Sequence, residues 1–223
     1  SDSNQLETVQ EGDHVAVIGR NRPSLYWSLL ACQHIGAIPV PLYQDAVAEE
    51  MEYILSHCGA SFAIVGDQEQ VDKILEISDR LKGFKDIVFV DPKGLRKYDN
   101  KNLHSLTDIL EIGSSDSAEL DKELNSRVEK VTGDTTCVLL YTSGTTGKSK
   151  GVVQTHRAII GASGGANQHD SWTHDDYLLS YLPMAWVGDF MISVAQGMGA
   201  GACINCPEGA ETMQVDLREI GPS

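Results

Sequence analysis

Residues 13–42 read DHVAVIGRNRPSLYWSLLACQHIGAIPVPL, and they carry the clearest sign of the fold class. The apolar run His14–Ile18 is predicted to be a buried strand. Pro23 is typical of the first turn of a helix, and this helix is expected to end at Gly36. Ile38–Leu42 is predicted to be a strand at an edge or a crossing, because two prolines interrupt it. The order strand, helix, strand indicates a parallel α/β unit.

The same alternation continues outward from this unit. Strands this apolar on both faces belong to parallel sheets covered by helices, so the predicted fold class is α/β, with mostly parallel sheets flanked by helices. Further strands are predicted at 62–65, 87–90, 136–141, 151–154, 177–182 and 201–205, and further helices at 47–58, 68–81, 156–168 and 187–198.

A polar segment, 91–130, separates two structured halves. It is predicted to hold one or two surface helices, with Ser114 or Ser115 as an N-cap, and no strong strand. The expected organisation is a first α/β subdomain at 1–92, a polar connecting segment at 93–130, and a second α/β subdomain at 131–223 that is truncated at its C-terminal end.

Composition excludes several classes of protein. The 223 residues are 41% hydrophobic, which favours a globular chain over a disordered one. A net charge of −15 disfavours nucleic-acid partners, so a site for an anionic ligand must be built locally. There is no run of 18 apolar residues and no signal-peptide pattern at the start, and the expected location is cytoplasmic. The pair Cys203 and Cys206 has the spacing of a zinc half-site but lacks a second pair, so unpaired thiols are expected.

Residues 141–151 read YTSGTTGKSKG and carry the chemistry. Glycines let the backbone approach a ligand and point successive N–H groups into one concavity, hydroxyls add donors, and Lys148 and Lys150 add positive charge. Each hydrogen bond to a charged group contributes about 1.5–3 kcal/mol, so a few suffice to bind a triphosphate. The alternative is an ordinary hairpin loop of turn residues. The lysines and the two flanking strands favour phosphate binding.

A nucleotide-triphosphatase P-loop is a competing interpretation. Gly147, Lys148 and Ser149 match the end of that pattern, but Thr142 stands where its first glycine belongs. The residues after the loop are predicted to form a strand, so no helix N-terminus faces the phosphates. The P-loop interpretation is therefore disfavoured.

Residues 141–152 closely resemble the phosphate-binding signature of the adenylate-forming superfamily, which includes acyl-CoA synthetases, luciferases and peptide-synthetase adenylation domains. The stretches at 12–17, 32–42 and 182–189 resemble other parts of that family, and 43–51 is most similar to bacterial long-chain fatty-acid–CoA ligases. The sequence departs from the family pattern in two places. Ser149 replaces a common proline, and Ala185-Trp186 replaces a histidine or aromatic pair.

The resemblance implies part of the large N-terminal domain of an adenylate-forming enzyme. Such an enzyme activates a carboxylic acid with ATP to an acyl-adenylate plus pyrophosphate, and coenzyme A then displaces AMP. It implies ATP, Mg²⁺ and coenzyme A as ligands, with Lys150 and Thr146 as catalytic residues and Thr146 also on the metal. The phosphate-binding residues it implies are Thr142, Ser143, Gly144, Thr145, Thr146, Gly147, Lys148, Lys150 and Gly151.

Two further positions are candidates for the acyl pocket. Trp186 is either a gate to an acyl tunnel or a core tryptophan. Gly164 belongs to a cluster of small residues on the predicted helix 156–168, where glycine is costly, so something is expected to lie close to it. Close packing of a neighbouring helix is favoured over an acyl chain.

Later signatures of the family are missing from the chain, namely those for adenine, for ribose and for the C-terminal catalytic lysine. The chain therefore resembles a fragment of a longer ligase, without the rest of its domain, and is expected to be catalytically incomplete alone. A peripheral membrane contact is compatible with the family. The alternatives are adenylation of an aryl or amino acid, or a nucleotide-binding module without catalysis.

Overall fold

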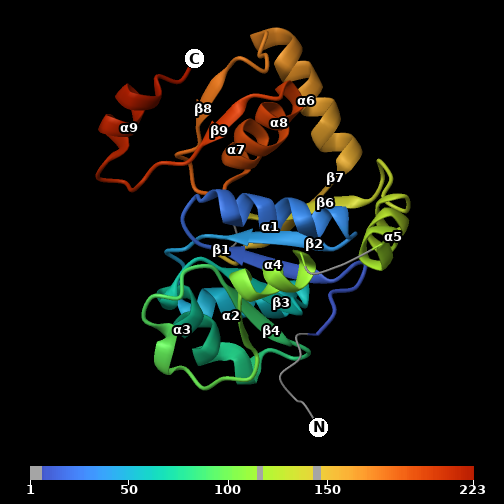
Figure 1. Ribbon diagram of the computed structural model, residues 1–223, viewed down its shortest axis with the longest axis vertical. Helices are drawn as coiled ribbons and strands as arrows, with labels where there is room; N and C mark the ends of the chain where they lie inside the picture. The colour runs from blue at the N-terminus through green and yellow to red at the C-terminus, as the bar shows by residue number, and fades with distance from the viewer. Residues whose placement is uncertain (1–6, 115–117, 143–146) are drawn as a thin grey trace.

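The computed structural model describes residues 7–114, 118–142 and 147–223 (Figure 1). Its central feature is a five-stranded parallel sheet in the order β2-β1-β3-β4-β5. Helices flank this sheet, so the predicted α/β class is confirmed. The strands are β1 (His14–Ile18), β2 (Ile38–Leu42), β3 (Phe62–Val65), β4 (Asp86–Phe89) and β5 (Leu103–Ser105).

Strand β2 lies at the edge of this sheet, as its prolines predicted. The N–H of Ile38 donates to the Asp13 carbonyl at 2.8 Å, so the even-numbered residues of β2 face β1. The backbone nitrogens of Pro39 and Pro41 therefore point away from β1. A residue other than proline at these positions would present a free N–H with which another strand could pair. The later strand β6 (Thr136–Thr142) lies alongside this edge but is hydrogen-bonded to a different partner.

Two layers of helices cover the sheet. Helix α1 (Pro23–His34) packs on one face through Leu25 and Leu29, against Val17 of β1. Helices α2 (Ala48–Cys58) and α3 (Gln68–Ile77) cover the other face. Alternate residues of β1 thus enter opposite layers, as expected for a strand buried on both faces.

The predicted helix boundaries are close to those observed. Helix α1 begins at Pro23. Helix α2 ends at Gly59, whose φ of 66° is the left-handed conformation typical of a glycine C-cap. A 3₁₀ turn, Ser78–Arg80, continues α3 towards the predicted end of that helix.

The polar segment was predicted to hold one or two surface helices, and it contains α4 (Leu106–Ser114) and α5 (Ala118–Val128). A 3₁₀ turn, Leu95–Lys97, precedes them. Strand β5 was not predicted; it is only three residues long and pairs with β4. The prediction of Ser114 as an N-cap is wrong, because Ser114 ends α4 and its hydroxyl donates to the Glu111 carbonyl. Ser115 lies outside the described residues.

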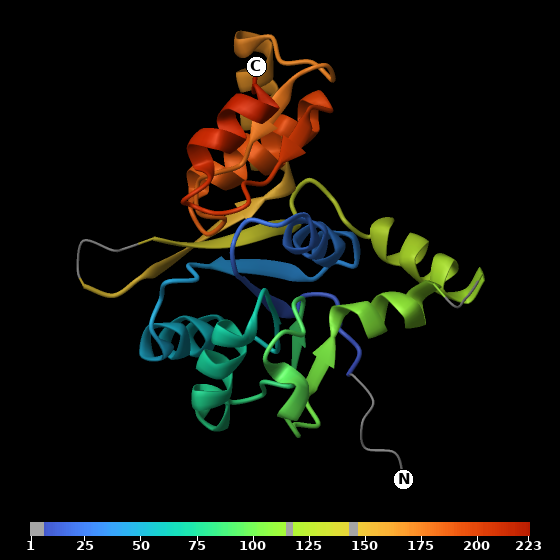
Figure 2. The ribbon, with the colours of Figure 1, turned by 60° about the vertical axis from the view of Figure 1, so that its left-hand side comes forward.

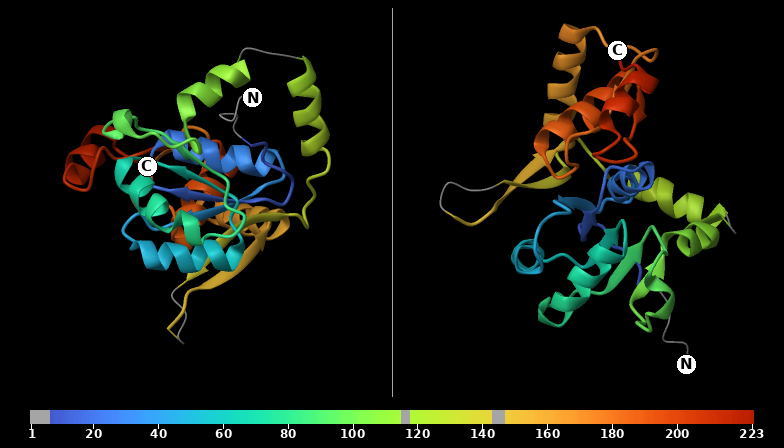
Figure 3. Two further views of the ribbon diagram at one scale, coloured as in Figure 1. Left: turned by 90° about the horizontal axis from the view of Figure 1, so that it is seen from below. Right: turned by 90° about the vertical axis from the view of Figure 1, so that its left-hand side faces the viewer.

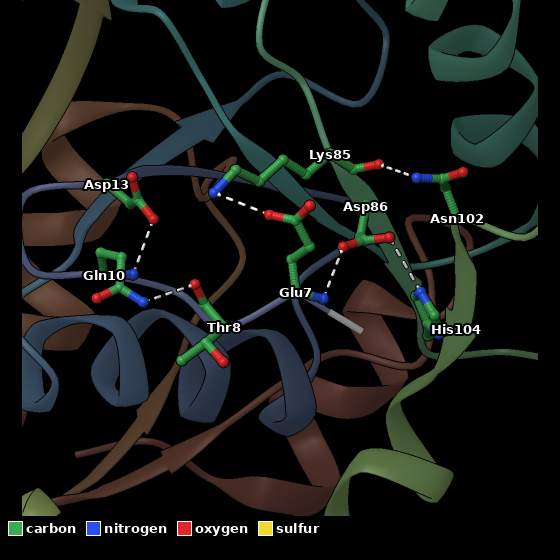
Figure 4. A network of polar contacts seen from close by, with 8 residues as sticks. All are labelled: Glu7, Thr8, Gln10, Asp13, Lys85, Asp86, Asn102 and His104. Atoms are coloured by element: carbon green, nitrogen blue, oxygen red, sulfur yellow. Dashed lines mark hydrogen bonds and ion pairs between the residues drawn. The ribbon is translucent and has the colours of Figure 1, made fainter. Parts of the chain in front are cut away.

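A polar network fixes the start of the described chain to the sheet (Figure 4). Asp86 is buried, and its carboxylate accepts the N–H of Glu7 at 3.1 Å and contacts His104 Nε2 at 3.1 Å. Lys85 adds an ion pair to Glu7 at 3.2 Å. These contacts join the N-terminal segment to β4 and β5.

The second region begins with an antiparallel hairpin, β6 and β7, which leaves the body of the molecule as a long ribbon (Figures 2 and 3). Leu139 of β6 packs with the α2–α3 layer, whereas Leu140 packs with the α1 layer, so β6 extends both layers. The other elements of this region are β7 (Lys150–Thr155), α6 (His156–Asp170), β8 (Tyr177–Leu179), α7 (Val187–Asp189), a π-helix (Phe190–Gly197), α8 (Met198–Ala200), β9 (Cys203–Asn205) and α9 (Met213–Ile220).

The helical segment at 187–200 confirms a predicted helix but differs in its hydrogen bonding. Residues Phe190–Gly197 form a π-helix, a conformation that is rare and frequent at functional sites. Strands β8 and β9 pair in parallel beside it. Within the described part of the chain, no helix has both the length and the apolar character that a membrane span needs.

A buried polar seam joins α1 to the second region. It consists of Asn21, Tyr26, Ser180, Asp189 and Ser193. The Tyr26 hydroxyl donates to Asp189 Oδ2 at 2.6 Å, and Ser193 donates to Asp189 Oδ1 at 2.9 Å. Asn21 Nδ2 donates to the Ser180 carbonyl at 2.8 Å. The two regions are thus held together by hydrogen bonds as well as by apolar contacts.

Candidate functional site

The β6–β7 hairpin places part of the predicted phosphate-binding set. Its register puts Thr142 opposite Lys150 and Tyr141 opposite Gly151. Gly147 and Lys148 lie between the paired strand ends. The predicted residues Ser143, Gly144, Thr145 and Thr146 lie outside the described residues, and so does the predicted metal ligand, which is Thr146.

Glycine is required at two positions of the hairpin, for a different structural reason at each. Gly147 has a φ of 95°, which other residues rarely adopt. A Cβ on Gly151 would come within 3.1 Å of Leu139 Cδ1 and 3.3 Å of Tyr141 Cζ, so this position stays small because β6 side chains lie against it. Gly147 therefore serves the turn and Gly151 serves the pairing of the strands.

The hairpin carries local positive charge on an acidic protein. Lys148 and Lys150 are both exposed. Among residues 7–114, 118–142 and 147–223, no carboxylate forms an ion pair with either lysine. The whole chain has a net charge of −15, so these two ammonium groups are a local concentration of positive charge on an acidic protein.

Helix α2 contacts the hairpin through residues that the sequence had not singled out. The Tyr53 hydroxyl donates to the Ser149 carbonyl at 3.1 Å, and Lys148 Nζ lies 5.2 Å from the centroid of the Tyr53 ring. One turn further, His57 Nδ1 is 2.7 Å from the Tyr141 hydroxyl. The spacing of four residues between Tyr53 and His57 was the available signal, since it puts both on one face of a helix.

A cavity of about 230 Å³ lies at the carboxyl ends of β1 and β2. Its wall is built from the loops that follow β1, β2, β8 and β9, and its polar side chains include Arg20, Asn21 and Glu211. Ligands of parallel sheets commonly bind at this end of the strands. Of the predicted site residues that the structure describes, none lines this cavity, although Ala185, the neighbour of Trp186, does.

Trp186 is not a core tryptophan in this structure, because 46% of it is exposed. It precedes α7, and its ring lies where a Cβ on Gly188 would meet it at 2.6 Å. Gly188 therefore leaves the space that the Trp186 ring occupies at the start of the helix. Trp186 is held in place yet open to solvent.

The close packing predicted around the glycines of α6 is absent from the described structure. Gly161, Gly164 and Gly165 are exposed, and no described atom lies within 4 Å of a Cβ placed on any of them. Helix α6 contacts the π-helix through its opposite side, where Asn167 Nδ2 donates to the Gln196 carbonyl at 3.0 Å. The glycines thus form an open face of α6.

The cysteines are free thiols, and burial raises the pKa of several of them. All five cysteines are unpaired, and burial raises the pKa of Cys58 to about 11 and that of Cys32 and Cys137 to about 12, which keeps these thiols protonated and unreactive. Within the described ranges, no group of three or more His, Cys, Asp or Glu side chains could hold a metal ion.

Two curated proteins illustrate what the sequence is similar to. The chain is 28% identical to the long-chain-fatty-acid–CoA ligase ACSBG1 of Rattus norvegicus, over 96% of this chain and 30% of the relative. It is 32% identical to fatty acyl-CoA synthetase A of Dictyostelium discoideum, over 79% of this chain and 26% of the relative. The chain therefore spans less than a third of the length of these curated relatives.

A solved structure shares the fold. The luciferase-like enzyme from the nonluminescent Zophobas morio mealworm superposes with a TM-score of 0.73 at 18% identity, over 95% of this chain and 46% of that one. The profile of the AMP-binding enzyme family matches residues 3–222, which is almost the whole sequence. The chain belongs to the AMP-binding enzyme family.

Proposed function

We propose that the β6–β7 hairpin binds the triphosphate of ATP, as part of a ligase that activates a long-chain fatty acid. The observation that supports this most strongly is the pair of exposed lysines where β7 begins, neither of which forms an ion pair with a carboxylate of the described residues. The reaction joins the carboxylate to the α-phosphate of ATP and releases pyrophosphate. The thiol of coenzyme A then attacks the acyl carbon and releases AMP.

The lysines and hydroxyls act electrostatically in this proposal. Negative charge collects on the leaving pyrophosphate, and donors fixed in advance stabilise it at no cost of reorganisation. Lys150, Lys148, Gly147, Gly151 and Thr142 are the described members of this set. Ser143, Gly144, Thr145 and Thr146 complete it by resemblance to the family signature.

Magnesium fits this donor set in a limited way. Mg²⁺ prefers oxygen ligands and commonly keeps several waters while it bridges substrate phosphates. The described hairpin offers the exposed Thr142 hydroxyl, and the resemblance adds Thr146. When bound, the ion would neutralise charge on the β- and γ-phosphates, and the protein would contribute few of its ligands.

The acyl substrate is proposed from the relatives and from two positions. Relatives named as long-chain fatty acid ligases favour a long apolar acid. Trp186 would close the acyl path as a gate, and the open glycine face at Gly164 would leave room for a chain beside α6. Free thiols throughout the chain fit the reducing cytoplasm.

Calorimetric titration of ATP with magnesium tests the binding step. Lys150→Ala is expected to weaken binding about tenfold or more, because it removes a charge-assisted contact worth about 1.5–3 kcal/mol. Lys82→Ala is a matched control, since it removes the same charge from an exposed loop before β4. Equal affinity of wild type and Lys150→Ala would contradict the proposal.

Catalysis by the isolated chain is a separate question. We propose that it binds ATP but does not complete the reaction, because it spans under a third of its relatives. Pyrophosphate release with ATP, magnesium and palmitate measures this. Turnover at about 1 s⁻¹ or faster, within the usual range for enzymes, would contradict the proposed inactivity.

A further inference from the structure

Helix α2 contacts the hairpin next to the two lysines that give the hairpin its positive charge. Tyr53 lies on α2, nearly 100 residues before Ser149, yet its hydroxyl donates to the Ser149 carbonyl. Because a peptide unit is planar, a carbonyl held in this direction also fixes the direction of the next N–H, which belongs to Lys150. One hydrogen bond therefore orients the backbone donor of a proposed phosphate-binding residue.

The ring of Tyr53 contacts the other lysine of the hairpin, Lys148. Lys148 Nζ stands 5.2 Å from the ring centroid, within the range of about 6 Å in which a cation is attracted to an aromatic face. Lys148 would otherwise be a long exposed side chain with many rotamers. The ring narrows the positions of its ammonium group.

A second contact from the same helix supports the first. His57 Nδ1 and the Tyr141 hydroxyl are 2.7 Å apart, and Tyr141 is paired with Gly151 across the hairpin. Helix α2 is itself well anchored, because Met51, Ile54 and Leu55 are buried in the core of the first region. The hairpin thus rests on a rigid element.

We propose that Tyr53 is a positioning residue for the phosphate-binding hairpin, holding the Ser149 carbonyl with its hydroxyl and the Lys148 ammonium group with its ring. This inference rests on the proposed function. Ser149 stands where related sequences commonly have proline, so the backbone here lacks that restraint. The Tyr53 contact supplies a restraint from outside the loop.

The test is titration of ATP with magnesium into the full 223-residue chain. Tyr53→Phe keeps the ring and removes the hydroxyl, and is expected to weaken ATP binding about threefold to tenfold. Tyr53→Leu also removes the ring and is expected to weaken it further. Tyr98→Phe is the matched control, because it removes a hydroxyl that bonds to Gln68 and Asp72, away from the hairpin.

A second variant separates positioning from general stability. Ser149→Pro restores the proline restraint but keeps the carbonyl, so Tyr53→Phe is expected to cost less ATP affinity in this background than in the wild type. A merely structural role for Tyr53 would give the same loss in both backgrounds. Equal losses, or wild-type affinity in Tyr53→Phe, would overturn the inference.

Hydrogen exchange of the free protein gives a readout that needs no nucleotide. Amides at 147–152 are expected to exchange several-fold faster in Tyr53→Phe than in the wild type, and unchanged in Tyr98→Phe. If wild type binds no ATP, the proposed function fails, and with it the role in phosphate binding. Exchange that is unchanged by Tyr53→Phe would overturn the restraint itself.

Discussion

The first α/β region and the second region, which begins at β6, differ in how completely their cores are formed. In the first region, five strands share one sheet whose central strands are covered on both faces, and residues such as Ile18, Met51 and Ile74 are fully buried. In the second, strands occur as two separate pairs, and several large apolar side chains are exposed. The region with the more complete core holds no predicted site residue, and the less complete one holds them all.

The seam between the regions explains how the open part stays in place. The loop before α1 supplies Asn21 and α1 itself supplies Tyr26, and these two side chains hydrogen-bond to Ser180 and Asp189. Helix α2 supplies Tyr53. Polar contacts are directional, so they fix orientation in a way that apolar packing alone does not. We therefore expect core and seam substitutions to act on stability, and substitutions on the hairpin-facing side of α2 to act on the geometry of the site.

The largest effect is expected in the core of the first region. Ile74→Ala should lower the free energy of unfolding by about 2–5 kcal/mol, because it leaves a cavity at a fully buried position. Urea denaturation measures this loss, while the ATP affinity of the folded protein should stay unchanged. Ile160→Ala makes the same substitution on the open face of α6, where 65% of the side chain is exposed, and should change stability by less than about 0.5 kcal/mol. Equal losses at both positions would mean that the face of α6 is covered in solution.

The second-largest loss of stability is expected for a substitution in the buried polar seam between the two regions. Tyr26→Phe removes the hydroxyl that donates to Asp189 and leaves a buried carboxylate with one donor fewer, at a cost of about 1–3 kcal/mol. Tyr177→Phe is the control, because Tyr177 is exposed in β8. Urea denaturation should show a loss for Tyr26→Phe alone. A neutral Tyr26→Phe would mean that the seam does not stabilise the contact between the regions.

The seam also predicts a pH dependence. Burial raises the pKa of the Asp189 carboxyl, although hydrogen bonds from Tyr26 and Ser193 act in the opposite direction. As pH rises past the ordinary value of 3.8, the carboxyl ionises in the unfolded chain first and in the folded protein only at higher pH. The folded state then binds more protons, so the free energy of unfolding falls as pH rises.

Asp189→Asn isolates this contribution, since the amide does not titrate. The stability of wild type relative to Asp189→Asn should fall as the pH of the urea denaturation series rises above the ordinary carboxyl pKa of 3.8. A difference that stays constant or grows over this range would show that the hydrogen bonds outweigh burial, and that the pKa is not raised.

The same contrast accounts for what the sequence allowed us to predict. Elements of the first region follow from local pattern, as in the proline start of α1 and the glycine end of α2, because buried strands and amphipathic helices leave periodic signals. The phosphate-binding hairpin also has a local signal, since its glycines and lysines are contiguous. Strand β5 was missed because three half-buried residues carry too little periodicity.

Contacts between distant segments left no such signal. The Tyr53–Ser149 bond and the seam join residues about 100 to 160 positions apart, and no spacing rule relates them. The π-helix was predicted as an ordinary helix, because hydropathy does not distinguish the two kinds of hydrogen bonding. The glycines of α6 suggested a close neighbour that no described residue provides. Local chemistry was therefore predictable, whereas its support from other elements was not.

The smallest effect concerns the caps of two helices, one in each region. The Asp67 carboxylate accepts the N–H of Gln70 at the start of α3, and the Thr155 hydroxyl accepts the N–H of Ala158 at the start of α6. Alanine at either position should weaken the first turn of its own helix by about 1 kcal/mol. Because the buried face of α3 lies in the core of the first region, Asp67→Ala should lower global stability and leave hydrogen exchange in α3 uniform.

Thr155→Ala should act more locally, since α6 buries little beyond Ile159 and Ser163. Its first-turn amides should exchange faster while urea denaturation barely changes, because a helix with a small buried face can fray without unfolding the rest. The reverse pattern, with global loss at Thr155 and local fraying at Asp67, would contradict the division between a closed first region and an open second one. Since α6 follows directly from β7, fraying there would also loosen the strand that carries Lys150, so Thr155→Ala should weaken ATP binding slightly and Asp67→Ala should not.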